Sequence, residues 1–116
     1  MTTRSPSRPC RGYVQAVLAA YLELPETPAR ARHPDRQLAH QLCQRAIPLS
    51  VVKDALLLAT ARRLTRPLNA PRLSPIHSLY YFLPVIEEVL QNPLPTGYAE
   101  YLSNKVRLFI QPLSGH

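Results

Sequence analysis

Proline divides this chain into short apolar segments, and that division limits what the chain can fold into. The sequence has 13 prolines and only 3 glycines among its 116 residues. Most of the prolines lie between segments whose apolar residues recur every three or four positions, the period of an amphipathic helix. Nothing alternates with a period of two over a useful length, as strands would require. The sequence therefore predicts an all-α fold, a compact bundle of about five helices.

Proline, capping residues and apolar periodicity together set the expected element boundaries. Helices are predicted over about residues 12–24, 34–47, 50–64, 75–91 and 97–110. Ser74 and Pro75 form a favourable start for the fourth helix. Pro84 lies inside that helix and removes one backbone hydrogen bond, which predicts a kink or two shorter helices. Residues 1–11 are basic and contain no acid, so we expect a flexible basic arm there and a single domain over 12–112.

The second and third helices form the expected centre of the bundle, a helical hairpin hinged at Pro48. The second helix has one apolar stripe, on which Leu38 and Leu42 lie, and an otherwise polar surface. The third is apolar almost all round, which predicts a buried helix. Its end carries arginines and no nearby acid in the sequence, so we expect these side chains to reach solvent.

Positive charge is the strongest functional signal in the sequence. Fourteen Lys and Arg residues against seven acids give a net charge of +7, and the isoelectric point is near 10.0. A domain this basic is expected to bind a polyanion, although an acidic protein partner would fit the same charge.

Four arginines that fall within eleven residues form what we call the arginine exit: Arg62, Arg63, Arg66 and Arg72. Arginine is suited to phosphate because its planar fork of donors matches phosphate oxygens. Arg36 and Arg45, on the polar side of the second helix, are secondary candidates that would extend this surface. An exposed Tyr80 beside arginines would stack on an unpaired base.

The residues of a catalytic or metal site are largely missing from the pattern. Glu87 and Glu88 are adjacent, so on a helix they point about 100° apart and make no carboxylate pair. They are expected to form a solvated helix face. His40 and Cys43 share one helix face, but no second pair stands at metal-ligand spacing. We therefore expect no enzyme activity, no metal and no cofactor.

Membrane association and secretion are not expected either. No run of about 18 apolar residues is present, and the N-terminal segment lacks the apolar region of a signal peptide. Cys10 and Cys43 are too few for a disulfide framework, which favours a reducing cytoplasm.

The stretch DRQLAHQLCQRAIPLSVVKDAL resembles the hairpin in the C-terminal helix-bundle domains of plasmid-type primases. In that pattern an acidic start, a small residue and a leucine precede an Arg-Gly turn and a second helix. The matching residues here are Asp35, Ala39, Leu42, Arg45, Val52 and Ala55, and Ala46 stands where the motif usually has glycine. The continuation, ARRLTRP and SPIHSLYYFLPVIEEVL, is similar to helical segments of mobile-element replication initiators. The resemblance covers roughly residues 35–90 and includes no catalytic primase region. It implies a DNA-contacting accessory domain, for instance for a single-stranded template.

Charge and resemblance together predict a nucleic-acid-binding accessory module, with DNA as the expected ligand, in replication or mobile-element maintenance. The alternative is a small helical protein–protein interaction subunit that docks in a larger replication or transposition assembly. The kinked helix over 76–90 and the tyrosines of the last helix would then form the interface. A homodimer fits the same features.

Overall fold

The computed structural model describes residues 7–67, 69–71 and 73–110 of the chain. Over these residues the chain forms five α-helices, one 3₁₀ helix and no strand, which confirms the all-α prediction. The elements are α1 (Ser7–Leu22), α2 (His33–Gln44), α3 (Leu49–Leu64), η1 (Leu79–Phe82), α4 (Leu83–Gln91) and α5 (Tyr98–Ile110). Residues 1–6 of the predicted arm and 111–112 of the predicted domain lie outside the described residues.

The N-terminal helix begins earlier than its sequence pattern predicts. α1 starts at Ser7 instead of near Gly12, so Arg11 belongs to a helix and not to a flexible arm. Pro9 falls in the first turn of α1, where the missing N–H of proline costs no intrahelical bond.

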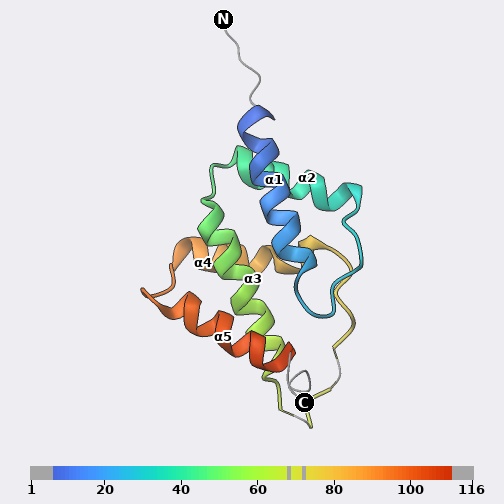
Figure 1. Cartoon of the computed structure of the whole chain (residues 1–116), viewed down its shortest axis with the longest axis vertical. Helices are drawn as coiled ribbons and strands as arrows, with labels where there is room; N and C mark the ends of the chain where they lie inside the picture. The colour runs from blue at the N-terminus through green and yellow to red at the C-terminus, as the bar shows by residue number, and fades with distance from the viewer. Residues whose placement is uncertain (1–6, 68, 72, 111–116) are drawn as a thin grey trace, which may run out of the picture.

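The third helix is the centre of the bundle, as predicted. α3 packs on α1, α4 and α5, and α1 also packs along α2 (Figure 1). Val52, Ala55 and Leu56 of α3 are buried, as is half of their helix. Tyr21 of α1 is fully buried and meets Phe82 of η1 edge-on, with 6.0 Å between ring centroids. Burial raises the pKa of Tyr21 to about 12.

The turn between α2 and α3 reverses the chain through a left-handed residue. Ala46 has a φ of 60°. This conformation favours glycine, because glycine has no Cβ. The N–H of Ile47 donates to the carbonyl of Leu42 at 3.2 Å, and that of Ala46 to Cys43 at 2.9 Å. These two bonds are those of a Schellman motif, which satisfies the last carbonyls of α2.

The fourth predicted helix is shorter and divided in two, as Pro84 suggested. Ser78, not Ser74, is its cap: the Ser78 hydroxyl accepts from the N–H of Tyr80 at 3.2 Å. The short η1 follows, and α4 then begins at Leu83 with Pro84 in its first turn. In that position proline costs no intrahelical bond, which is why the chain restarts there.

One buried carboxylate joins two elements that lie far apart in the sequence. Asp35 is 1% exposed and accepts from the N–H of Arg32 at 2.8 Å and from the N–H of Leu79 at 2.9 Å. It therefore caps the start of α2 and holds the start of η1 beside it.

Candidate nucleic-acid interface

Two of the three described arginines of the arginine exit, Arg62 and Arg63, are bound by carboxylates. Arg63 is buried, with a side chain only 4% exposed. Its Nε and Nη2 donate to Oε1 of Glu26 at 2.9 and 2.7 Å, and Nη2 also donates to the carbonyl of Ser74. Its guanidinium lies 5.4 Å from the ring centroid of Tyr81 and donates to the Tyr81 hydroxyl at 3.2 Å. The expectation that Arg63 reaches solvent is wrong, because two loops and a tyrosine enclose it.

Two more of the predicted arginines are exposed but paired with carboxylates. Arg62 forms a bidentate pair with Glu88, at 3.0 and 2.6 Å, and Arg45 forms one with Glu87, at 2.7 and 3.0 Å. The hydrogen bonds from these arginines hold the pKa values of Glu87 and Glu88 below the ordinary glutamate value. The acids predicted to be a merely solvated helix face therefore neutralise Arg45 and Arg62.

Arg66 lines a hollow of about 340 Å³ together with Arg62 and Arg63. Arg66 is exposed and donates to the carbonyl of Pro71 at 2.7 Å. Arg72 lies outside the described residues. Tyr80 is 44% exposed, as the stacking hypothesis requires, but it is Tyr81, not Tyr80, that contacts Arg63.

Arg36 belongs to a different part of the molecule, a groove between α1 and α2. The groove has a volume of about 660 Å³. Residues from one face of each helix line it. Arg11, Val14, Gln15 and Leu18 come from α1, and His33, Arg36, Gln37, His40, Gln41 and Gln44 come from α2.

The groove is basic and polar, and its lining is free of acid. Among the described residues that line it, none carries a carboxylate. Arg11 and Arg36 are both exposed, and neither makes an ion pair with another described residue. A concave surface that carries only positive charges attracts anions, because its low-dielectric walls concentrate the electric field. The groove thus combines a concave shape with two arginines that have no ion pair, whereas of the described arginines at the arginine exit only Arg66 has none.

A disulfide and a hydrogen bond hold the walls of the groove together. Cys10 of α1 and Cys43 of α2 are joined by a disulfide, with 5.7 Å between their Cα atoms. The Tyr13 hydroxyl donates to the carbonyl of Ile47 at 2.8 Å, close to the same end of α2. The pairing of the cysteines was not expected from their small number. It fixes the spacing of α1 and α2 covalently.

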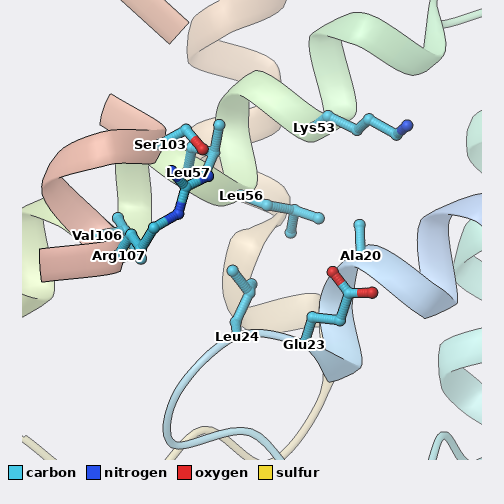
Figure 2. A pocket seen from close by; sticks show the side chains of 9 residues that line it. All are labelled: Ala20, Glu23, Leu24, Lys53, Leu56, Leu57, Ser103, Val106 and Arg107. Atoms are coloured by element: carbon cyan, nitrogen blue, oxygen red, sulfur yellow. The ribbon is translucent and has the colours of Figure 1, made fainter. Parts of the chain in front are cut away.

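A second hollow, of about 440 Å³, lies between the end of α1, α3 and α5 (Figure 2). Leu24, Leu56 and Val106 contribute apolar surface to it. Charges of both signs surround this surface, namely those of Glu23, Lys53 and Arg107. In Figure 2 the Lys53 amine extends away from the apolar side chains. This hollow lacks the single-sign charge of the α1–α2 groove.

The described residues offer no arrangement for metal chemistry. No group of three or more His, Cys, Asp or Glu side chains among them could hold a metal ion. His40 and Cys43 share a helix face, but the sulfur of Cys43 is bonded to that of Cys10 and so is not a free thiolate ligand. Across the same residues, no helix has both the length and the apolar character to cross a bilayer.

The groove could have been found in the sequence from side-chain spacing. His33, Gln37, His40 and Gln44 recur every three or four residues and so share one face of α2. Arg11, Gln15 and Leu18 do the same on α1. That α2 face was recognised only as polar, and the start of α1 was assigned to the arm, so the two faces were not brought together.

No family model, no curated protein and no solved structure matches this chain. The resemblance to helix-bundle domains of plasmid-type primases therefore stays a prediction.

Proposed function

We propose that this protein is a nucleic-acid-binding accessory module that contacts phosphates through the α1–α2 groove. The observation that carries the proposal is the pairing of cations: Arg45, Arg62 and Arg63 are neutralised, whereas Arg11 and Arg36 of the groove are not. Phosphate contacts supply most sequence-independent affinity for nucleic acid, so unpaired arginines in a concave site favour this ligand. DNA, as part of replication or mobile-element maintenance, is the ligand that the sequence resemblance favours.

The proposed cytoplasmic location bears on the disulfide. Cytosolic glutathione and thioredoxin keep most thiols reduced, so the Cys10–Cys43 bond would open there. Binding should therefore be measured with both the oxidised and the reduced chain.

The proposal is tested by removing the two groove arginines together. The variant Arg11→Ala/Arg36→Ala and the matched variant Arg62→Ala/Arg107→Ala lose the same charge at different places. Fluorescence anisotropy with labelled DNA and RNA, single- and double-stranded, at two salt concentrations should show about tenfold weaker binding for the groove variant. The slope of log affinity against log salt should also fall by about 1.5 for that variant.

Two results would overturn the proposal. One is the absence of binding to every oligonucleotide at low salt. The other is an equal loss of affinity in both variants, because net charge alone would then explain the binding. Circular dichroism of each variant confirms that the helices remain folded.

A second function, protein–protein docking, is favoured by the outer face of α5. Tyr98 and Tyr101 are exposed and stack with 5.6 Å between their ring centroids, and Leu108 on the same helix is 73% exposed. Exposed aromatic and aliphatic side chains grouped on one helix are typical of interfaces. A larger replication or transposition protein, or a second copy of this chain, would bind there. Sedimentation of the wild type and of Tyr101→Ser/Leu108→Ser tests the homodimer.

A further inference from the structure

The shape of the α1–α2 groove distinguishes between paired and unpaired nucleic acid. Duplex DNA is a convex rod, and proteins usually contact it by inserting a protruding helix or ribbon into the major groove. Here two helices instead enclose a hollow of about 660 Å³. A flat base can enter such a hollow only if it is not paired and stacked within a duplex. The concave form therefore favours an unpaired nucleotide.

The groove is lined by exposed side chains with the hydrogen-bonding groups that base edges require. Four of the lining residues are glutamines: Gln15 on α1 and Gln37, Gln41 and Gln44 on α2. Each glutamine amide both donates and accepts, as do the Watson–Crick edges of bases, and the four are neutral. A site that bound only phosphate, or only an acidic peptide, would have no need of these amides.

The groove also has surfaces for the face of a base. Val14 and Leu18 are half-buried and give the α1 wall apolar character. His33 and His40 contribute flat imidazole rings from α2. Unpaired bases are commonly held by stacking on aromatic side chains and by contact with apolar ones, while cations nearby bind the backbone. Arg11 and Arg36 are placed at the same groove for that last role.

We infer that the α1–α2 groove is a site for unpaired nucleotides, so that the protein binds single-stranded nucleic acid in preference to duplex. This inference rests on the proposed function and adds the class of strand and the contacts to the base. The hydrogen bond from Tyr13 to Ile47, and the Cys10–Cys43 disulfide in the oxidised chain, hold α1 and α2 together before a nucleotide binds. Such preorganisation reduces the ordering cost of binding.

The test compares one labelled single strand with the duplex of the same sequence at the same salt concentration. The full chain is expected to bind the single strand about tenfold more tightly. Gln15→Leu removes an amide from the groove without changing the charge or adding an aromatic ring, and it should weaken single-strand binding more than duplex binding. Gln91→Leu is the matched control, because Gln91 is an exposed glutamine at the end of α4, outside the groove. It should bind like the wild type.

The outcomes separate this inference from the proposed function. Equal, salt-dependent binding of single strand and duplex would overturn the inference and leave the proposed function standing. Binding to neither at low salt would overturn both. Tighter binding of a poly-glutamate peptide than of any oligonucleotide would assign the groove to an acidic protein instead.

A second variant keeps the test decisive if the loss of one amide is too small to measure. Gln37→Leu/Gln41→Leu removes two amides at nearly constant volume and adds no bulk to the groove. Single-strand affinity should fall about tenfold in this variant, and duplex affinity should fall less. An unchanged preference for the single strand in a folded variant would overturn the inference.

Discussion

The arginine exit and the α1–α2 groove both carry arginines, but two of the three described arginines of the exit have carboxylate partners and the two of the groove have none. At the end of α3, Arg62 and Arg63 are bound by Glu88 and Glu26. In the groove, Arg11 and Arg36 have no ion pair with a described residue. In this chain, two arginines of the dense run connect structural elements through ion pairs, whereas the two scattered arginines of the groove have no ion pair with a described residue.

The difference has a tertiary cause that local sequence does not contain. The glutamates that neutralise Arg62, Arg63 and Arg45 lie 26, 37 and 42 residues away from them. They reach the arginines because α4 packs on α3, and because the loop after α1 crosses the end of α3. Arg63 in particular ties that loop to Ser74 in the loop before η1. Arg63 therefore joins the two loops, through its ion pair with Glu26 and its hydrogen bond to the Ser74 carbonyl.

Among the variants that test how each region is stabilised, removal of the disulfide should lower the free energy of unfolding the most. Cys10→Ser/Cys43→Ser opens a covalent link between residues separated by 33 positions. Because the link restricts the unfolded chain, its loss should lower the free energy of unfolding by about 3–4 kcal/mol. Urea unfolding followed by circular dichroism measures this change.

Reduction of the wild type by a dithiol is the matched control for the serine variant. It should produce a similar loss, and the serine variant should not respond to the reductant. A free energy of unfolding that is the same with and without reductant would show that the α1–α2 contact is held without the disulfide.

The next largest effect is expected from Arg63→Met, which preserves the length of the side chain but removes its donors. We expect the free energy of unfolding to fall by about 2–3 kcal/mol, because Arg63 is buried and bonds two loops. Arg62→Met is the control, and its exposed pair should contribute little. Nucleic-acid affinity should stay unchanged in both, as long as they are folded. Strong weakening of binding in the Arg62 variant would restore the arginine exit as a binding surface.

The smallest effect, an increase in affinity, is expected from Glu87→Gln. This change frees Arg45, which follows the groove residue Gln44 directly. Binding of a single strand should tighten about two- to fivefold at low salt, with a salt slope steeper by about 0.7. Glu88→Gln is the control: it frees Arg62 of α3, which does not line the groove. If the two changes raise the affinity equally, the ligand does not distinguish the groove from the α3 end.

Low pH should weaken the pairs of Glu87 and Glu88 with their arginines, as the glutamine substitutions do, because protonation also removes the negative charge. The pKa values of Glu87 and Glu88 are lowered in the folded protein, so the pairs stabilise it at and above the ordinary glutamate pKa of about 4.3. That stabilisation is lost as the pH falls through the lowered values. The melting temperatures of the wild type and of Glu87→Gln/Glu88→Gln should therefore converge at acid pH. The difference at neutral pH should be small because the pairs are exposed.

Local sequence signals predicted the helices well and the site poorly, for physical reasons. Apolar period and proline position are local, and they located α3 to within a residue and the division of the fourth helix at Pro84. The start of α1 and the choice of Ser78 over Ser74 as a cap depend on tertiary packing, and both were missed. The exposure of Arg63 could not be predicted, because Glu26 meets it only in the folded chain. The polar face from His33 to Gln44 was visible as a spacing, but its opposite wall lay in the supposed arm.

Asp35 connects the region of the groove with the far side of the bundle. It holds the first turn of α2, whose polar face forms one wall of the groove, and it holds the N–H of Leu79, where the chain that leads into α4 begins. Breaking either contact alone would leave one oxygen of a buried carboxylate without its hydrogen bond, so both are expected to open in one event. In amide hydrogen exchange, α2 and the η1–α4 segment would then behave as one cooperative unit although 44 residues separate their shared contact. The groove would gain its rigidity from a part of the chain that no ligand touches.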